Sequence, residues 1–144
     1  MRFLDANVFI YAYYKPKSKL SEKQRKMKEC AKEIVRRINE GEDVMTTIVH
    51  LSEVSNILKR ALPMEDLYSL LVGLFSLDNI KIVDVTKEDY FGAMELMKEL
   101  KIDPNDCLAV EVMKREGLTE IYTFDKGFDD VGGIRRISCG MDLQ

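Results

Sequence analysis

The feature that most constrains this chain is a regular alternation of short apolar runs with longer segments of helical period. The longer segments carry apolar side chains every three to four positions, which is typical of amphipathic helices. The short runs have the length and composition of buried strands: RFL at 2–4, DVMTT at 43–47, IKIVDV at 80–85, EIYTF at 120–124 and, less clearly, IRRIS at 134–138. Strands that alternate with helices predict an α/β fold, a three-layer α/β/α sandwich around a mainly parallel, twisted sheet.

Most of the helical segments carry start or stop signals of their own. These signals are a Ser-x-x-Gln capping box at 21–24 with a closing glycine at Gly41, a stop at Pro63, a threonine cap at Thr86, and a first-turn Pro104 with a closing Gly117. The segment MEDLYSLLVGLFSL at 64–77 is apolar on more than one face. We expect it to pack in the core or against a second subunit.

Length and cysteine content limit the class of protein. With 144 residues and no linker or repeat, we expect one domain over residues 1–144. Cys30, Cys107 and Cys139 are odd in number, widely spread and without a CxxC pair, which argues against a disulfide framework or a zinc knuckle and favours a reducing cytoplasm. No apolar stretch is long enough to span a bilayer, so we expect no membrane partner.

The charge distribution is uneven. The net charge of −3 does not by itself suggest nucleic-acid binding. However, residues 15–37 hold ten Lys or Arg against three Glu, while the rest of the chain is acidic. Two interpretations stay open: the solvated face of an amphipathic helix, or a basic surface for an anionic partner.

Four acids fall near the ends of predicted elements. Asp5 follows the first strand, Asp125 follows the fourth, Glu53 lies early in the helix after the second, and Asp106 lies in the first turn of its helix. Ligands of such sheets bind at the carboxyl ends of the strands, so these acids can share one edge. Each acid taken alone could equally be a helix cap, a first-turn residue or a turn residue.

A cluster of four carboxylates is costly unless a cation neutralises it. Oxygen ligands of this kind suit Mg²⁺ or Mn²⁺, which can activate a bound water for attack on a phosphodiester. No Ser/His/Asp or Cys/His set competes, because the lone His50 has no obvious partner and the cysteines receive no catalytic role. Phosphotransfer on an aspartate ranks low, because the position two residues after Asp5 is Asn7.

Four blocks of the chain, FLDANVFIYA, HLSEVSNIL, DPNDCLAV and IYTFDKGFDD, resemble the PIN-domain family, in particular its short stand-alone VapC-like members. The resemblance implies a parallel sheet with helices on both faces and an acidic pocket that binds Mg²⁺ or Mn²⁺. It also implies cleavage of single-stranded RNA and a tendency to dimerise. The resemblance assigns catalysis and metal binding to Asp5, Glu53, Asp106 and Asp125.

The same blocks suggest supporting residues. Asn7 would orient ligands or water, Ser52 precedes Glu53 as is common in the family, and Thr123 would supply a hydroxyl to the pocket. Asp129 matches a position that is less regularly acidic. Asp103 precedes its block and is interpreted as the start of a helix.

The leading prediction is a Mg²⁺- or Mn²⁺-dependent endoribonuclease that cleaves single-stranded RNA, in the form of a VapC-type toxin with an antitoxin partner and a homodimer. The alternatives are a housekeeping RNA-processing nuclease and an inactive PIN-fold interaction module. Tyr11, Tyr13 or Tyr14 could stack a base. Candidate contacts to RNA phosphates are Lys15, Lys17, Lys19, Arg25, Arg135 and Arg136.

Overall fold

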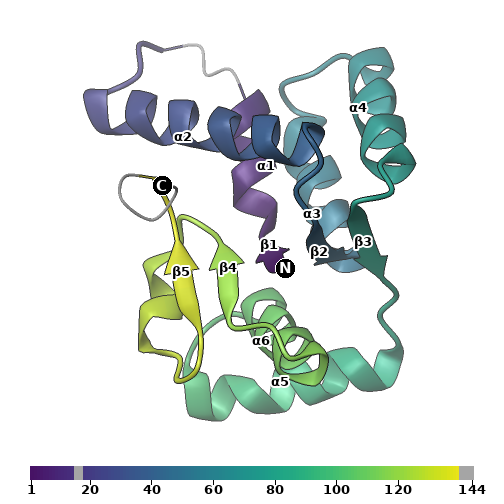
Figure 1. Cartoon of the computed structure of the whole chain (residues 1–144), viewed down its shortest axis with the longest axis vertical. Coiled ribbons are helices and arrows are strands. Elements are labelled where there is room, and N and C mark those ends of the chain that lie inside the picture. The colour runs from purple at the N-terminus through teal and green to yellow at the C-terminus, as the bar shows by residue number, and fades with distance from the viewer. Residues whose placement is uncertain (15–17, 140–144) are drawn as a thin grey trace.

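A computed structural model describes residues 1–14 and 18–139 of the chain. A sheet of five strands crosses the molecule in the order β3-β2-β1-β4-β5, and every neighbouring pair is parallel (Figure 1). The strands are β1 (Arg2–Leu4), β2 (Val44–Thr47), β3 (Ile80–Val83), β4 (Glu120–Tyr122) and β5 (Arg135–Ile137). The predicted parallel sheet is confirmed, including its uncertain fifth strand.

Six α-helices and one short 3₁₀-helix connect these strands in the described part of the chain. They are α1 (Ala6–Tyr13), α2 (Glu22–Asn39), α3 (Ile48–Leu58), α4 (Met64–Ser76), α5 (Lys87–Leu100), α6 (Pro104–Glu116) and the 3₁₀-helix η1 (Lys126–Asp130). Within the described residues, none of the helices is long and apolar enough to cross a membrane.

The two faces of the sheet build two cores. Phe3 and Ile121 pair across β1 and β4 and point to one face, while their neighbours Leu4 and Tyr122 point to the other. The Leu4 face packs against α1 to α4, and the Phe3 face packs against α5, α6 and η1. This alternation follows from the two-residue period of a strand, and it confirms the three-layer α/β/α arrangement (Figure 1).

The predicted helix starts are confirmed at the level of individual hydrogen bonds. Ser21 and Gln24 form a reciprocal capping box, with distances of 3.0 and 3.1 Å between each side-chain oxygen and the other residue's backbone nitrogen. Thr86 caps α5 in the same way. At the end of α6, Gly117 adopts the left-handed conformation, with φ of 73°, that favours glycine at a helix C-terminus.

Two boundaries differ from the prediction. Helix α3 ends at Leu58, well before Pro63, and β4 ends at Tyr122 rather than at Phe124. The second difference has a clear cause. The Thr123 hydroxyl and the Phe124 backbone N–H are hydrogen-bonded to the side chains of Asp5 and Asn7, so the chain leaves the sheet to build the edge described below.

One side of helix α4 packs against the core, as one of the two expectations held. It buries Leu67 and Leu74, and Leu70 and Leu71 pack partly buried beside them. Another face carries an apolar stripe at helical spacing, with exposed fractions between 44% and 71%; the stripe comprises Met64, Tyr68, Val72 and Phe75. The alternative, packing against a second subunit, stays a prediction.

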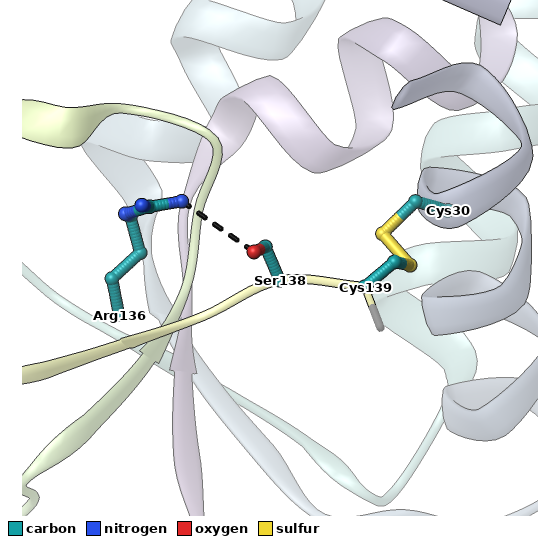
Figure 2. The surroundings of a disulfide bond; sticks show 4 residues. All are labelled: Cys30, Arg136, Ser138 and Cys139. Atoms are coloured by element: carbon teal, nitrogen blue, oxygen red, sulfur yellow. Dashed lines mark hydrogen bonds between the residues drawn. A yellow bond between two sulfur atoms is a disulfide. The ribbon is translucent and has the colours of Figure 1, made fainter. Parts of the chain in front are cut away.

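The sequence argued against a disulfide framework, but two of the three cysteines do pair. Cys30 of α2 and Cys139, just after β5, form a disulfide with a Cα–Cα distance of 5.4 Å (Figure 2). The two positions are 109 residues apart, so their spacing gave no sign that the end of β5 lies against α2. Cys107 is a buried free thiol.

Candidate active site

The acids gather where the strand order reverses. Strand β1 is central, with β2 on one side and β4 on the other, and the first residues beyond the C-terminal ends of β1 and β4 are Asp5 and Thr123. Ligands bind at such a switch point because the loops that follow the two strands diverge there. The backbone N–H of Asp5 donates to the carbonyl of Tyr122 at 3.0 Å, which ties the two strand ends together.

The hydroxyl of Thr123 is the centre of this edge. It donates a hydrogen bond to Oδ2 of Asp5 at 2.7 Å and accepts two, from Nδ2 of Asn7 and from the backbone N–H of Asp125, each at 3.1 Å. One donor and two acceptor positions are all that a hydroxyl offers, so Thr123 is fully used. Asp5 and Asn7 at the start of α1 are thereby held in fixed positions relative to Asp125 after β4.

Asp5 and Asp125 each have a second local role. The Oδ1 atom of Asp5 accepts from the N–H of Ala6 at 2.8 Å and caps α1, and Oδ1 of Asp125 accepts from the N–H of Gly127 at 2.8 Å. A Cβ atom on Gly127 would lie 3.1 Å from that same Asp125 oxygen, which explains the small residue there. The capping interpretation of Asp5 is therefore confirmed without excluding a role at the site.

Helix α6 delivers the third acid. Asp103 caps the helix by accepting from the N–H of Asp106 at 2.9 Å, as its predicted role at a helix start requires. This arrangement places the nearly buried Asp106 carboxyl beside Asp5 and Asp125. Asp103 itself is exposed, yet its charge also acts on Asp5 and Asp106, an influence that sequence reasoning missed.

Glu53 is held at one side of this group. Its Oε1 accepts from Nδ2 of Asn105 at 2.8 Å, and Oδ1 of Asn105 accepts from the Tyr90 hydroxyl at 2.7 Å. The chain Tyr90–Asn105–Glu53 runs from α5 through the first turn of α6 to α3. Asn105 sits beside Asp106 in sequence and could have been suspected; Tyr90 carries no sequence signal.

The carboxyl groups suppress one another's ionisation. Burial raises the pKa of Asp5 to about 6, against the opposing hydrogen bonds from Thr123 and Ala6, and the charges of Asp125 and Asp103 add to the rise. Burial also raises the pKa of Asp106 strongly, helped by the charges of Asp5, Asp103 and Asp125 and by a hydrogen bond with Asp125. Without a cation nearby, the Asp106 carboxyl therefore tends to keep its proton.

This donor set fits a hard divalent cation by its chemistry. Buried carboxylates that keep a proton for want of a counter-charge, with an amide and a hydroxyl beside them, are the oxygen ligands that Mg²⁺ and Mn²⁺ prefer. The side chains do not stand in a finished coordination shell: among the described residues, no three His, Cys, Asp or Glu side chains are arranged to hold a metal ion. Glu53 in particular points to Asn105.

The remaining predicted residues lie outside this group. Ser52 is exposed on α3, and Asp129 is exposed on η1, where Arg136 lowers its pKa through two hydrogen bonds of 2.9 and 3.2 Å. Arg135, at the opposite end of the sheet, pairs with Glu120. Lys19 and Arg25 are exposed, and Lys15 and Lys17 lie outside the described residues.

His50 has a structural environment. Its Nδ1 lies 2.7 Å from Oγ1 of Thr47, its ring meets Phe3 edge-on, and its Nε2 is buried without a partner among the described residues. Burial lowers the pKa of His50 to about 4, although the charge of Glu53 opposes this. The imidazole is therefore neutral at physiological pH, and it packs the start of α3 against Phe3 of β1.

Comparisons with known proteins identify the fold. The structure is similar to that of VapC20 of Mycobacterium tuberculosis, a toxin that cleaves the sarcin-ricin loop, with a TM-score of 0.69 and 21% identity over 92% of this chain and 95% of that one. A toxin-antitoxin complex from Klebsiella pneumoniae follows at a TM-score of 0.64, with 15% identity over 94% and 96% of the two chains. VapBC2 of Rickettsia felis, solved bound to a DNA fragment from its promoter, follows at 0.62, with 18% identity over 94% and 96%.

These likenesses concern the fold alone. A comparison of the sequence with curated proteins gives no match. The model of the PIN-domain family matches residues 2–134, which is nearly the whole chain and includes all four predicted acids. The chain therefore belongs to the PIN-domain family.

Proposed function

We propose that this protein is a metal-dependent endoribonuclease that cleaves single-stranded RNA. The observation that carries the proposal is the group of carboxyls of Asp5, Asp106 and Asp125, in which burial and mutual repulsion raise the pKa of Asp5 and of Asp106. A group of this kind is stable as an ionised set only with a cation, and PIN nucleases generally use divalent metals.

Asp5, Asp106 and Asp125 would hold Mg²⁺ or Mn²⁺, and Glu53 would complete the set directly or through water. When bound, the metal supplies an activated water for attack on the phosphodiester and stabilises the departing oxyanion. Thr123 and Asn7 fix the positions of the Asp5 and Asp125 carboxylates through the hydrogen bonds described above. Ser52 and Asp129 are left at the margin of the site.

We further propose that the nuclease acts as a VapC-type toxin, held in check by a small antitoxin protein. Support comes from its solved relatives in fold, which include a sarcin-ricin-loop-cleaving toxin and VapBC complexes. A housekeeping RNA-processing role is the alternative. Expression of the chain alone would separate the two roles. A toxin arrests growth, and co-expression of its neighbouring gene restores growth. A housekeeping nuclease does not arrest growth.

A homodimer through α4 forms part of the proposal. The stripe of Met64, Tyr68, Val72 and Phe75 is a contiguous apolar surface on one helix, and such surfaces mark protein contacts. Sedimentation of the purified protein should give a dimer, and Phe75→Glu should give a monomer of unchanged helical content. A monomeric wild type would contradict this part alone.

The test of the nuclease is cleavage of labelled single-stranded RNA with and without Mn²⁺. Asp5→Asn should abolish Mn²⁺-dependent cleavage while circular dichroism shows an intact fold, because an amide still caps α1. Asp84→Asn, an exposed aspartate after β3, is the matched control and should cleave like the wild type. Equal Mn²⁺-dependent cleavage by the Asp5 variant would refute the proposed metal site, and no cleavage by the wild type would leave an interaction module as the better interpretation.

A further inference from the structure

A groove of about 680 Å³ opens beside the acidic group. One side is formed by α1 and the first half of α2, and the other by the chain after β4 and the end of β5. The residues that line it are Tyr11, Ser21, Lys23, Gln24, Lys26, Met27, Cys30, Phe124, Lys126, Arg136, Ser138 and Cys139. None of the four predicted acids lines the groove.

The charged residues that line the groove are all cations, of which Lys26 pairs with Glu22 and Arg136 with Asp129 just outside it. Lys23, Lys26, Lys126 and Arg136 line it, and none of the described lining residues carries a carboxylate. The guanidinium of Arg136 is oriented by Asp129 and by Oγ of Ser138, at 3.5 Å (Figure 2). The three lysine side chains are exposed to solvent. A concave surface of this charge favours an extended anionic ligand.

The groove also offers aromatic surface. The rings of Tyr11 and Phe124 meet edge-to-face, with their centroids 5.2 Å apart, and Tyr11 keeps 36% of its surface exposed. Single-stranded nucleic acids are bound by the combination of cations that follow the phosphates with aromatic rings on which bases stack. An acidic peptide would use the lysines but would gain little from such a ring pair.

The groove is continuous with the site through three successive residues. Phe124 follows Thr123, the hydroxyl that fixes Asp5 and Asp125, and its N–H donates to Oδ1 of Asn7 at 3.3 Å. Lys126 directly follows Asp125 and opens η1. A strand with its scissile phosphate at the carboxylates would therefore enter the groove at its next nucleotides.

A disulfide joins the two sides of the groove. The Cys30–Cys139 disulfide joins α2 to the segment that carries Arg136 and Ser138 (Figure 2). The two sides of the groove thus keep their separation without a ligand, which limits the ordering that binding requires.

We propose that this groove binds the single-stranded RNA adjacent to the cleaved bond. Lys23, Lys26 and Lys126 contact its phosphates, and one base stacks in the Tyr11–Phe124 corner. The inference rests on the proposed nuclease function for the identity of the ligand. It assigns substrate contacts to groups that lie outside the acidic site.

Binding can be measured apart from cleavage. Fluorescence anisotropy of a labelled short oligouridylate, with full-length protein in EDTA, reports affinity without catalysis. Lys23→Gln combined with Lys26→Gln should weaken binding at least tenfold. It should also reduce the magnitude of the slope of log K against log salt by about 1.4, since each single-strand phosphate contact contributes about 0.7. The matched control, Lys59→Gln with Lys87→Gln, removes the same charge from exposed positions outside the groove and should change neither.

The stacking arm uses Tyr11→Ala. This variant should lose about fivefold or more in affinity for oligouridylate, and little for an abasic strand of equal length, because only the former has bases to stack. Tyr68→Ala, an exposed tyrosine on α4, is the control. Circular dichroism of each variant verifies that the fold is retained.

The outcomes separate this inference from the nuclease proposal. Lysine and tyrosine effects on binding without any cleavage by the wild type would support the groove and refute the nuclease. If the wild type cleaves RNA and the groove variants bind RNA normally, the proposed role of the groove is refuted and the nuclease proposal stands. If abasic RNA and a glutamate-rich peptide both bound as tightly as oligouridylate, the groove would be assigned to an acidic protein segment and the proposal would be overturned.

Discussion

The side-chain amide of Asn105 donates a 2.8 Å hydrogen bond to Oε1 of Glu53, so the outlying acid of the site is oriented by a neighbour of Asp106. Tyr90 fixes the amide in turn through its hydroxyl. Partners of metal-ligating carboxylates affect metal affinity and activity by about 10- to 100-fold when they are removed. Asn105 is therefore expected to act as a positioning residue.

Asn105→Ala should raise the Mn²⁺ concentration needed for half-maximal cleavage by about tenfold or more, with a smaller effect at saturating metal. Tyr90→Phe, which keeps the ring and loses only the hydroxyl, should shift the same curve in the same direction by less. Asn56→Ala, at an exposed position on α3, is the matched control. An unchanged Mn²⁺ titration in the Asn105 variant would show that Glu53 needs no such support.

Thr123→Val should disturb the site strongly, although the two side chains have nearly the same size. The change removes a hydroxyl that serves Asp5, Asn7 and Asp125 and leaves the buried Asp5 carboxyl without a partner there, at a cost of about 1–3 kcal/mol in unfolding free energy. Cleavage should fall with it. Thr123→Ser restores the hydroxyl and should recover most of both, which denaturant unfolding and an RNA cleavage assay can verify. Similar behaviour of the Val and Ser variants would contradict this.

The metal-free protein should lose stability as the pH rises from 6.5 to 8. The folded-state pKa of Asp106 is raised, so its contribution is fully present below the ordinary aspartate value near 4 and is lost as the pH rises through the folded value. One proton limits the change to about 1.4 kcal/mol per pH unit. His50, whose pKa is lowered to about 4, has the opposite sign but acts only below its ordinary value near 6.5.

Thermal unfolding in EDTA at several pH values between 6.5 and 8 measures this effect. The melting temperature should fall with pH in the wild type and stay nearly level in Asp106→Asn. Addition of Mn²⁺ should raise the melting temperature most at the upper end, where the carboxylates are ionised. An equal decline in the wild type and the Asp106 variant would assign the titration to other groups.

Reduction of the Cys30–Cys139 disulfide should destabilise the fold. In the chain-entropy account, a cross-link between residues 109 apart restricts the unfolded chain by about 5 kcal/mol. Unfolding in urea with and without dithiothreitol tests this, and Cys30→Ser supplies the control, because the reductant should have no further effect on it. Identical unfolding of the wild type under both conditions would mean that the thiols do not pair in solution.

The residues that sequence could locate are those with a local signal. Asp5 directly follows β1, Asp125 follows β4 by three residues, and Asp106 lies in the first turn of α6, so the order of elements predicts the edge that they share. The caps at Ser21, Thr86 and Asp103 are equally local. These features depend on neighbours within a few residues, which a sequence displays.

What sequence could not locate depends on contacts between distant elements. The hydroxyl of Tyr90 reaches Glu53 only through Asn105, across three helices. The Cys30–Cys139 pair and the groove beside it require the end of β5 to lie against α2. The exposed stripe of α4 shows the same limit: the apolar residues were visible, but which of them face the core is decided by packing.

The disulfide also divides the chain into two unequal parts with respect to backbone cleavage. Any single proteolytic cut between Cys30 and Cys139 leaves one covalent molecule, and the segments that bear Glu53, Asp106 and Asp125 stay attached. The segment before Cys30 has no such protection, and it carries Asp5, Asn7 and Tyr11. Under non-reducing conditions, a nick in the connection between α1 and α2 would thus break the covalent link to the first carboxylate and to the ring of Tyr11 together.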